Sequence, residues 1–157
     1  MTIRQRIINW AATRAPDFII GGQEDPYLLR WWLFPRNPVF NVYVHRFQRS
    51  DDDRALHTHP WAFNCSILLE GMYWEHTPSG TRLLTAGDWK FRWGRAPHRI
   101  ELLQPLGRFG VPVYCWTLFI TGPRVRSWGF LCPQGFVHWR AFTDSRDKGA
   151  IGKGCAQ

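Results

Sequence analysis

The sequence lacks the long apolar run that a membrane-spanning helix needs. Such a helix takes about 20 consecutive apolar residues, and the apolar stretches here are short and interrupted by charged or turn-forming residues. Residues 1–14 also lack the apolar core and the small-residue cleavage site of a secretory signal. We therefore expect a cytoplasmic protein without a transmembrane segment.

Cysteine is scarce and unpatterned. No C-x-x-C spacing occurs among the four cysteines, which are Cys65, Cys115, Cys132 and Cys155. A structural zinc site built from thiolates is therefore not expected. In a reducing compartment the default state of such cysteines is the free thiol.

Acidic residues are fewer than basic ones, with 12 Asp and Glu against 20 Lys and Arg, which gives a net charge of +8. Such an excess is typical of nucleic-acid-binding proteins, but the arginines are scattered singly and no helix-turn-helix, zinc-finger or ribonucleoprotein motif accompanies them. A solvated basic surface is favoured over nucleic-acid binding. A third interpretation is an anionic small substrate, bound by arginines that neighbour the histidine motifs described below: Arg46, Arg54, Arg92 and Arg99.

Short apolar runs separated by turn residues dominate the chain after residue 27. They predict strands over residues 27–34, 39–47, 61–69, 72–76, 81–84, 89–93, 98–103, 111–121, 127–131 and 136–142. A weakly amphipathic segment over residues 2–13 predicts a short helix. With 157 residues and 45% apolar content, the chain can fill one core. We expect a single all-β domain over residues 1–157, a sandwich or barrel, with a flexible tail at 144–157.

The strongest functional signal is the segment His57-Thr58-His59. Side chains alternate between the two faces of a strand, so His57 and His59 project to the same side and can hold one metal ion between them. A third histidine, His98, begins a later predicted strand. Asn64 is followed by six residues and then by Gly71.

In this register the chain resembles the cupins, whose two motifs read G-x5-H-x-H-x(3,4)-E-x6-G and G-x5-P-x-G-x2-H-x3-N. The resemblance covers about residues 38–121. Five residues stand at positions of the motifs with the expected residue type: His57, His59, Gly71, Gly87 and His98. Five others depart from them: Asp51 for the first glycine, Asn64 for the glutamate ligand, and Trp93, Arg95 and Leu102 in the second motif.

The resemblance implies a double-stranded β-helix, the jelly-roll barrel of cupins, here with a short N-terminal helix. It implies metal ligation by His57, His59 and His98, with Asn64 as a neutral fourth ligand or as a partner of a metal-bound water. Neutral imidazoles suit Fe(II), which we expect first, and also Zn(II) and Ni(II), with Mn(II) less favoured. The absent carboxylate makes the site similar to that of the three-histidine thiol dioxygenases.

Two classes of function follow from the resemblance. The first is a small-molecule metalloenzyme, either a dioxygenase-like oxidoreductase that uses Fe(II) or a metal-dependent isomerase or lyase. The second is a non-catalytic cupin that binds a small ligand or serves as an interaction domain in a phage or host assembly. The strings 128–130 and 137–139 resemble the ends of small uncharacterised cupins from bacteriophages and bacteria. Fold resemblance leaves catalysis open, because function belongs to the site.

Glu75 is the leading candidate for a catalytic acid or base. Glu75 lies two residues after Tyr73 in a predicted strand, so both side chains are expected on the same face. A carboxylate inside an apolar barrel has a raised pKa and can move protons. For Glu75, a position inside the barrel and one facing solvent are equally expected. For Glu101, the position facing solvent is favoured. The acidic loop at 51–54 could bring a carboxylate to a ligand histidine. His45 is expected in the core or at the rim, and His76 and His138 in structural or exposed positions.

Tryptophan is abundant, with ten residues, most of them in predicted strands. Aromatic rings pack well on pleated surfaces, so core packing and contacts within a homodimer are the default interpretation. The alternative is a stacking surface for a sugar or base near the barrel mouth. Trp61 and Trp93 are the best candidates for it because each lies within a metal motif.

Overall fold

The largest element of the fold is an antiparallel sheet of six strands. The computed structural model describes residues 1–51, 55–103, 114–144, 146 and 151–155. The strand order in this sheet is β1 (Phe18–Ile20), β2 (Leu28–Trp32), β3 (Asn41–Phe47), β10 (Cys115–Thr121), β5 (Phe63–Glu70) and β8 (Trp89–Trp93). Neighbours that are distant in sequence, such as β3 and β10, make this a jelly-roll topology.

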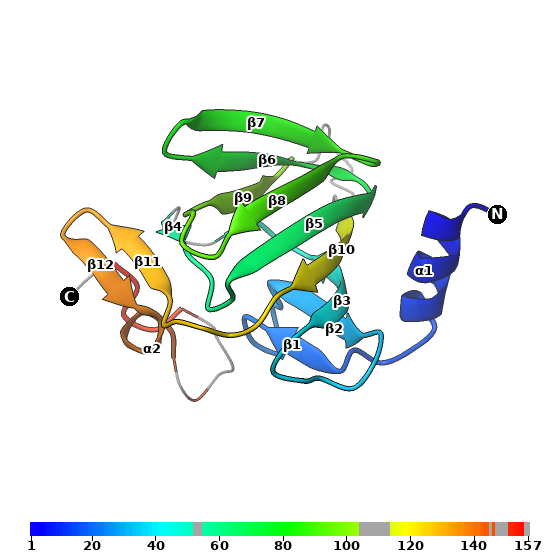
Figure 1. The fold of residues 1–157 in the computed structure, drawn as a ribbon, viewed down its shortest axis with the longest axis horizontal. Coiled ribbons are helices and arrows are strands. Elements are labelled where there is room, and N and C mark those ends of the chain that lie inside the picture. Colours follow the sequence, from blue (N-terminus) through cyan, green and yellow to red (C-terminus); the bar gives the residue numbers. More distant parts are fainter. Residues whose placement is uncertain (52–54, 104–113, 145, 147–150, 156–157) are drawn as a thin grey trace.

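Two smaller sheets complete the barrel. One contains β7 (Gly80–Thr85), β6 (Met72–Thr77) and β9 (Arg99–Leu102), and the other contains β12 (Gly135–His138), β11 (Gly129–Cys132) and β4 (Leu56–His57). In Figure 1 the first lies above the six-stranded sheet and the second at its left. A backbone pair between His57 and His98 links them edge to edge, with N···O distances of 2.8 and 3.0 Å.

The main core lies inside the barrel. Alternation along β5 turns Asn64, Ser66 and Leu68 inward, where all three are buried. The apolar cluster around Leu68 also contains Leu28, Phe47, Tyr73, Leu84, Ile100, Leu102 and Cys115. Burying one such apolar side chain stabilises the folded protein by roughly 1.5–3 kcal/mol. The apolar cluster thus fills the part of the barrel around Leu68.

The N-terminal helix α1 (Ile3–Ala12) covers the outer face of the six-stranded sheet. Thr2 caps it by accepting a hydrogen bond from the backbone N–H of Gln5. The buried residues Ile8 and Ala11 belong to the same cluster as Trp31 and Trp116, whose rings stack 5.4 Å apart. The predicted N-terminal helix is confirmed.

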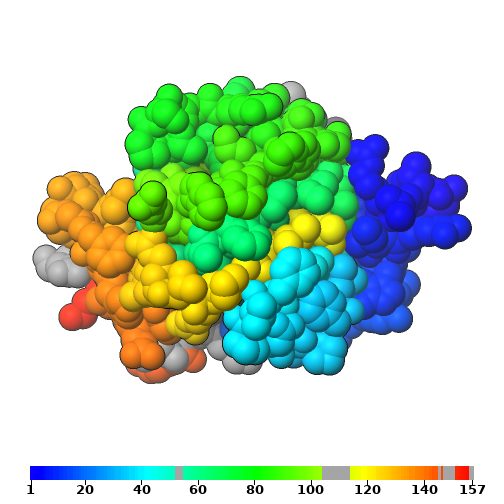
Figure 2. All heavy atoms as spheres, viewed as in Figure 1, coloured from blue at the N-terminus to red at the C-terminus, as the bar shows by residue number. Residues whose placement is uncertain are grey.

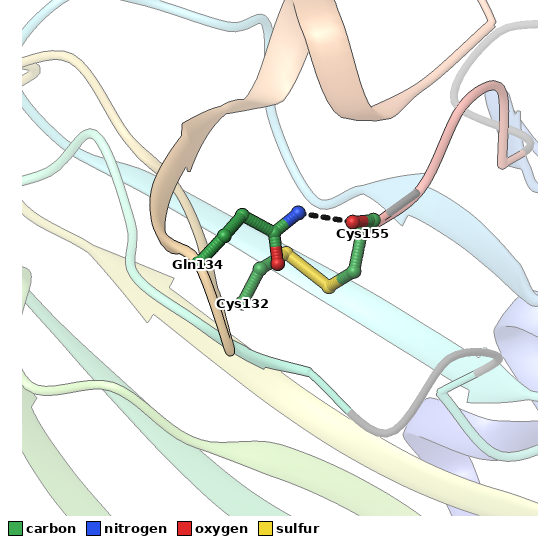
Figure 3. The surroundings of a disulfide bond; sticks show 3 residues. All are labelled: Cys132, Gln134 and Cys155. Carbon is green, nitrogen blue, oxygen red and sulfur yellow. Dashed lines mark hydrogen bonds between the residues drawn. A yellow bond between two sulfur atoms is a disulfide. The ribbon is translucent and has the colours of Figure 1, made fainter. Parts of the chain in front are cut away.

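The C-terminal region differs from the sequence prediction. Cys132 and Cys155 form a disulfide, and the side-chain amide of Gln134 donates to the Cys155 carbonyl (Figure 3). The expectation of four free thiols is therefore wrong for this pair, while Cys65 and Cys115 are free. The pairing depends on the packing of residues 151–155, whose Gly152 and Gly154 N–H groups donate to the Phe142 carbonyl. No cysteine spacing encodes that contact.

A short helix, α2 (Trp139–Phe142), replaces the second half of the strand predicted at 136–142. The side chain of His138 accepts a hydrogen bond from the Arg140 N–H and so caps the helix. Strand β1, which is three residues long, had no counterpart in the prediction, and the strand expected at His57 and His59 is only the two residues of β4.

The fold is the predicted one, an all-β double-stranded β-helix with a short N-terminal helix. In the space-filling view the N-terminal helix (blue) and the C-terminal segment (orange and red) lie at opposite ends of the molecule (Figure 2). Neither helix in the described part of the chain is long and apolar enough to cross a membrane.

Candidate metal centre

Three histidines converge at one end of the barrel. His57, His59 and His98 each offer a ring nitrogen, and these atoms all lie within 4.8 Å of one another. The Nε2 atoms of His59 and His98 are 2.9 Å apart, and the ring centroid of His57 lies 4.9 Å from that of His98. The structure therefore brings together all three histidines that the motifs singled out.

Backbone pairing explains this convergence. His57 ends β4, and His98 directly precedes β9 as its partner across the junction of the two small sheets. The N–H of His59 donates to the Gly94 carbonyl at 2.8 Å. Gly94 is required there, because a Cβ at this position would lie 1.7 Å from the Trp61 carbonyl oxygen. This close approach holds the chain after β4 against the end of β8.

Two of the three histidines, His59 and His98, have lowered pKa values, which favour the neutral form that metal binding needs. Burial lowers the pKa of His59 and His98 well below the usual value, and neighbouring positive groups, including Arg92, lower it further. Neutral imidazole has a free ring nitrogen lone pair and can ligate a metal without first losing a proton.

Glu75 and Arg92 form a buried ion pair next to His98. Oε1 of Glu75 lies 3.1 Å from Nδ1 of His98 and 2.5 Å from Nε of Arg92, and Nη2 of Arg92 also contacts this oxygen. Glu75 is 1% exposed, so it lies inside the barrel and the solvent-facing alternative is wrong. A carboxylate on the far ring nitrogen is the usual partner of a metal-ligating histidine.

A second carboxylate lies near His57. Oδ2 of Asp51 is 3.8 Å from Nδ1 of His57 and accepts a hydrogen bond from the Ile100 N–H at 2.5 Å. The acidic loop thus brings a carboxylate to a candidate ligand, as its sequence suggested. The remaining loop positions, 52–54, lie outside the described residues.

Asn64 lies on the inward face of β5, in register with Arg92 on one side and Thr121 on the other. Its side chain is completely buried, and neither its amide oxygen nor its amide nitrogen has a hydrogen-bond partner in the described part of the chain. An unpaired buried amide is costly. The position leaves two N–H donors and a carbonyl acceptor available to a ligand or a water.

The arginines that the sequence suggested as anion binders have other partners. Arg92 is paired with Glu75, Arg99 lies 3.1 Å from Glu101, and the guanidinium of Arg46 lies over the ring of Tyr114. Arg54 lies outside the described residues. Arg92 and Arg99 are thus already paired with carboxylates of the chain.

The remaining histidines and carboxylates have structural positions. His76 lies 3.0 Å from the half-exposed Glu101, as expected for a pair outside the barrel. His45 is buried, as expected, and its Nε2 accepts a hydrogen bond from Nε of Arg30 at 2.8 Å. Arg30 was not among the residues singled out from the sequence, and the irregular burial pattern of its strand gives no signal for its contact with His45.

The two tryptophans of the metal motifs lie on opposite sides of the barrel wall. Trp61 stacks on His59 with ring centroids 5.5 Å apart and packs edge-on against Phe119 at 5.6 Å. Trp93 is 59% exposed on the outer face of β8. Only Trp61 therefore lies where it could contact a molecule bound at the histidines.

Solved structures share this fold at low sequence identity. The polyketide cyclase RemF from Streptomyces resistomycificus is 17% identical, with a TM-score of 0.51 over 69% of this chain and 72% of the cyclase. The DMSP lyase DddQ from Ruegeria pomeroyi is 15% identical, with a TM-score of 0.51 over 69% of this chain, which spans 54% of the lyase.

A third similar structure is an uncharacterised protein with a double-stranded β-helix domain from Klebsiella pneumoniae. It is 15% identical, with a TM-score of 0.49 over 66% of this chain and 83% of that protein. No family model and no curated protein sequence matches the chain. The likeness to the cyclase and the lyase shows that the three chains share a fold.

Proposed function

We propose that this protein is a metal-dependent enzyme that acts on a small molecule, with His57, His59 and His98 as the metal ligands. The observation that carries the proposal is the convergence of three histidine side chains whose ring nitrogens lie within 4.8 Å of one another. Fe(II) is the first candidate metal, followed by Zn(II), Ni(II) and Mn(II), since imidazole nitrogen suits the later members of this series best.

The donor set fits a catalytic metal better than a structural one. Three protein ligands leave coordination positions open for substrate, whereas structural sites are usually closed by four. A metal bound there would supply Lewis-acid polarisation of a substrate oxygen or, with iron, redox chemistry. Asn64 adds no charge, so the residues at the site hold the metal through neutral groups.

In this proposal Glu75 is a positioning residue rather than the proton carrier expected from the sequence. Arg92 pairs with the Glu75 carboxylate and holds it in place beside His98. Oε1 of Glu75 lies 3.1 Å from Nδ1 of His98, on the side of the ring opposite the Nε2 atom that faces Nε2 of His59. The Asp51 carboxylate lies 3.8 Å from Nδ1 of His57, which is close enough for charge attraction and longer than a hydrogen bond.

The buried pair also favours a functional centre over an empty structural cavity. Removing two charges from water is expensive, and apolar side chains of similar size would often stabilise a core as well or better. Glu75 and Arg92 are 1% and 5% exposed. Because this pair lies beside His98, a candidate metal ligand, it supports an enzyme. The alternative is a non-catalytic cupin that binds a small molecule or a partner protein.

The similar structures agree with this choice only at the level of the fold. Two of them are described as a polyketide cyclase and a DMSP lyase, both enzymes with small-molecule substrates. The double-stranded β-helix of this chain can therefore accommodate such chemistry. The reaction class, whether oxygenation, isomerisation or elimination, is left to experiment.

Metal analysis is the direct test. Protein purified without chelator should contain about one equivalent of metal, and His57→Ala, His59→Ala and His98→Ala should each lower the content at least tenfold. His138→Ala, which changes a histidine outside the cluster, is the matched control. Full metal content in His98→Ala would overturn the assignment.

Catalysis is then tested on the Fe(II)-loaded protein by oxygen uptake with a panel of thiols and carboxylic acids. Proton NMR of the same mixtures detects elimination or isomerisation. Turnover that disappears in His98→Ala supports the enzyme, and metal-loaded protein that turns over none of the panel favours the binding-protein alternative.

A further inference from the structure

The outer face of the six-stranded sheet is apolar where β5 and β8 lie side by side (Figure 1). Side chains alternate between the two faces of a strand, and the buried Asn64 and Arg92 point into the barrel. The residues between them point outward and pair across the two strands: Trp93 with Phe63, Phe91 with Cys65, and Trp89 with Ile67. We call these six residues the apolar face, and none of them carries a charge.

The exposure of this surface is unusual. An antiparallel sheet normally presents polar side chains on the face that meets water. Trp89, Phe91 and Trp93 are instead 67%, 43% and 59% exposed. Helix α1 covers only the neighbouring part of the sheet, where it packs in one cluster with Leu69 and Trp116. The three rings of β8 therefore remain open to solvent in the described part of the chain.

An open hollow of about 370 Å³ lies at one end of the apolar face. It is lined by Trp93 of the face and by Ala62, Arg95, Val125 and Arg126. Cavities of this size accommodate small ring systems. Trp89, the most exposed ring of the face, lies at the opposite end of β8. The face thus has an exposed ring at one end and a hollow at the other.

We propose that the apolar face is the interface of a homodimer, in which Trp89 of each copy enters the hollow of the other. A two-fold axis perpendicular to the strands makes this contact twice, as an isologous interface requires. It also keeps the two α1 helices apart, because α1 lies at the Trp89 end: a Cβ at Gly87 would be 3.4 Å from Nη1 of Arg4. Arg95 and Arg126 then border the incoming indole, and arginines lie over tryptophan rings elsewhere in the chain.

The exposed area is of the size that such an interface needs. An aromatic side chain buries about 150–250 Å² when it is covered, so the exposed fractions of Trp89, Phe91 and Trp93 correspond to roughly 250–400 Å² per copy. A standard interface buries about 800 Å² per partner. The partly exposed residues of β5 and the walls of the hollow provide the remaining surface. Aromatic enrichment and the lack of charge are also typical of the core of an interface.

A second copy of the chain fits this surface better than a nucleic acid. Single-stranded nucleic acids bind aromatic rings together with cations that follow the phosphates, and the six residues of the face include no cation. An uncharged apolar surface is complementary to another such surface, which a second copy provides. The face lies on the outer side of the sheet, whereas Asn64 lies on the inner side, so this inference goes beyond the proposed function and requires no metal.

Sedimentation equilibrium of the full chain measures the oligomeric state. Wild type at micromolar concentration should have twice the 18.5 kDa mass of one chain. Trp89→Ser and Val125→Asp alter the ring and the hollow, and each should raise the dimer dissociation constant at least about tenfold. Phe136→Ser removes a ring that is 53% exposed on β12, outside the face, and should dimerise as wild type does.

A mixture of the two variants tests the pairing itself. In a heterodimer of Trp89→Ser with Val125→Asp, the intact Trp89 of one copy meets the intact hollow of the other, whereas neither homodimer retains such a contact. Native mass spectrometry of an equal mixture, at a concentration where each variant is partly dimeric, should show more heterodimer than the statistical half. A statistical mixture would reject the pairing.

Cys65 reports on the contact between the two faces. It is a free thiol in the middle of the apolar face, and two sheets packed face to face lie about 10 Å apart. A short bismaleimide should therefore link Cys65 of one copy to Cys65 of the other in wild type, and Cys65→Ser should lose this link. If Trp89→Ser does not fold, Val125→Asp and this cross-link in wild type decide.

Two further results would overturn the proposal. One is a wild type that stays monomeric at its highest soluble concentration, including a monomer that binds a single-stranded oligonucleotide through Trp89. The other is a dimer that forms no Cys65 cross-link and is as stable in Trp89→Ser and Val125→Asp as in wild type, since such a dimer uses a different surface.

Discussion

One carboxylate oxygen of Glu75 lies close to both His98 and Arg92: Oε1 is 3.1 Å from Nδ1 of His98 and accepts a hydrogen bond from Nε of Arg92 at 2.5 Å. Glu75 belongs to β6 and Arg92 to β8, so the pair joins the small sheet to the six-stranded sheet at the level of the histidines. One side chain therefore contributes to both the orientation of a candidate ligand and the closure of the barrel.

Replacing that carboxylate should affect stability and metal affinity together. Glu75→Gln keeps the size of the side chain but leaves Arg92 buried without a counter-charge, which should lower the free energy of unfolding by about 3–5 kcal/mol. It also weakens the hold on His98 and should lower Zn(II) affinity 10- to 100-fold. Urea unfolding of metal-free protein and a chelator competition assay measure the two effects.

Glu101→Gln is the matched control for Glu75, because Glu101 is a half-exposed carboxylate that pairs with His76 and Arg99 outside the barrel. It should change unfolding by less than about 1 kcal/mol and leave Zn(II) affinity unchanged. Wild-type Zn(II) affinity in Glu75→Gln would contradict the positioning role.

The buried histidines predict that metal-free protein loses stability in mild acid. Burial holds the pKa of His45, His59 and His98 well below the usual 6.5. The unfolded chain therefore binds more protons than the folded one as the pH falls below about 6.5, and the free energy of unfolding drops by up to about 1.4 kcal/mol per pH unit for each histidine. Above this range the contribution is fully present.

Urea unfolding at pH 7, 6 and 5 measures this dependence. His45→Gln should reduce the slope between pH 6 and 5 by the share of one histidine, because it removes one of the three titrating groups but keeps a hydrogen-bonding side chain beside Arg30. An unchanged slope in this variant would mean that His45 does not titrate as its burial requires.

The disulfide makes a separate prediction about the C-terminal region. Cys132 and Cys155 close a loop across a sequence separation of 23 residues, and Cys132 packs in a cluster with Ala55, Val137 and Phe142. Removing such a bond typically costs about 2–5 kcal/mol. Cys132→Ser/Cys155→Ser should therefore melt at lower temperature than oxidised wild type, and a reducing agent should lower the wild-type melting temperature to a similar extent.

The matched control is Cys65→Ser, which changes a cysteine that is free in the structure. Its melting temperature should respond to the reducing agent as wild type does. A melting temperature of wild type that does not respond to reduction would contradict a stabilising role of the bond.

The sequence predicted the fold and the histidine cluster because both depend on local patterns. The spacing of His57 and His59 on one extended segment is a local property, and most strands follow apolar runs bounded by turns. His98 could be added only through its resemblance to a motif. Its contact with His57 is a backbone pair between two strand ends, and no periodicity encodes it.

What the sequence could not supply are contacts set by the pairing of distant strands. Arg92 and Arg30 are both arginines in predicted strands, yet Arg92 meets Glu75 and Arg30 meets His45. Which face a strand residue occupies depends on register, and a shift of one residue exchanges the two faces. The disulfide depends likewise on how residues 151–155 pack on Phe142.

Asn64 provides the last prediction, because it stands where most cupins have a ligand glutamate and its buried amide is unpaired within the described residues. Asn64→Glu adds a hard anionic oxygen to a set of neutral nitrogens. Since oxygen ligands favour Mn(II) relative to imidazole alone, the variant should bind Mn(II) at least tenfold more tightly than wild type. The gain should grow as the pH rises through the carboxyl pKa, because only the ionised carboxylate ligates well.

Thermal melts with and without Mn(II) test this expectation. Without metal the new carboxylate is buried at a position that is completely inaccessible, so the variant should melt below wild type. Mn(II) should then raise its melting temperature more than that of wild type, since binding to the folded state stabilises it. Asn64→Gln, which lengthens the side chain equally but adds no charge, should show no such gain. A destabilised Asn64→Glu protein that Mn(II) does not rescue would place the side chain of residue 64 away from the metal and remove it from the ligand set.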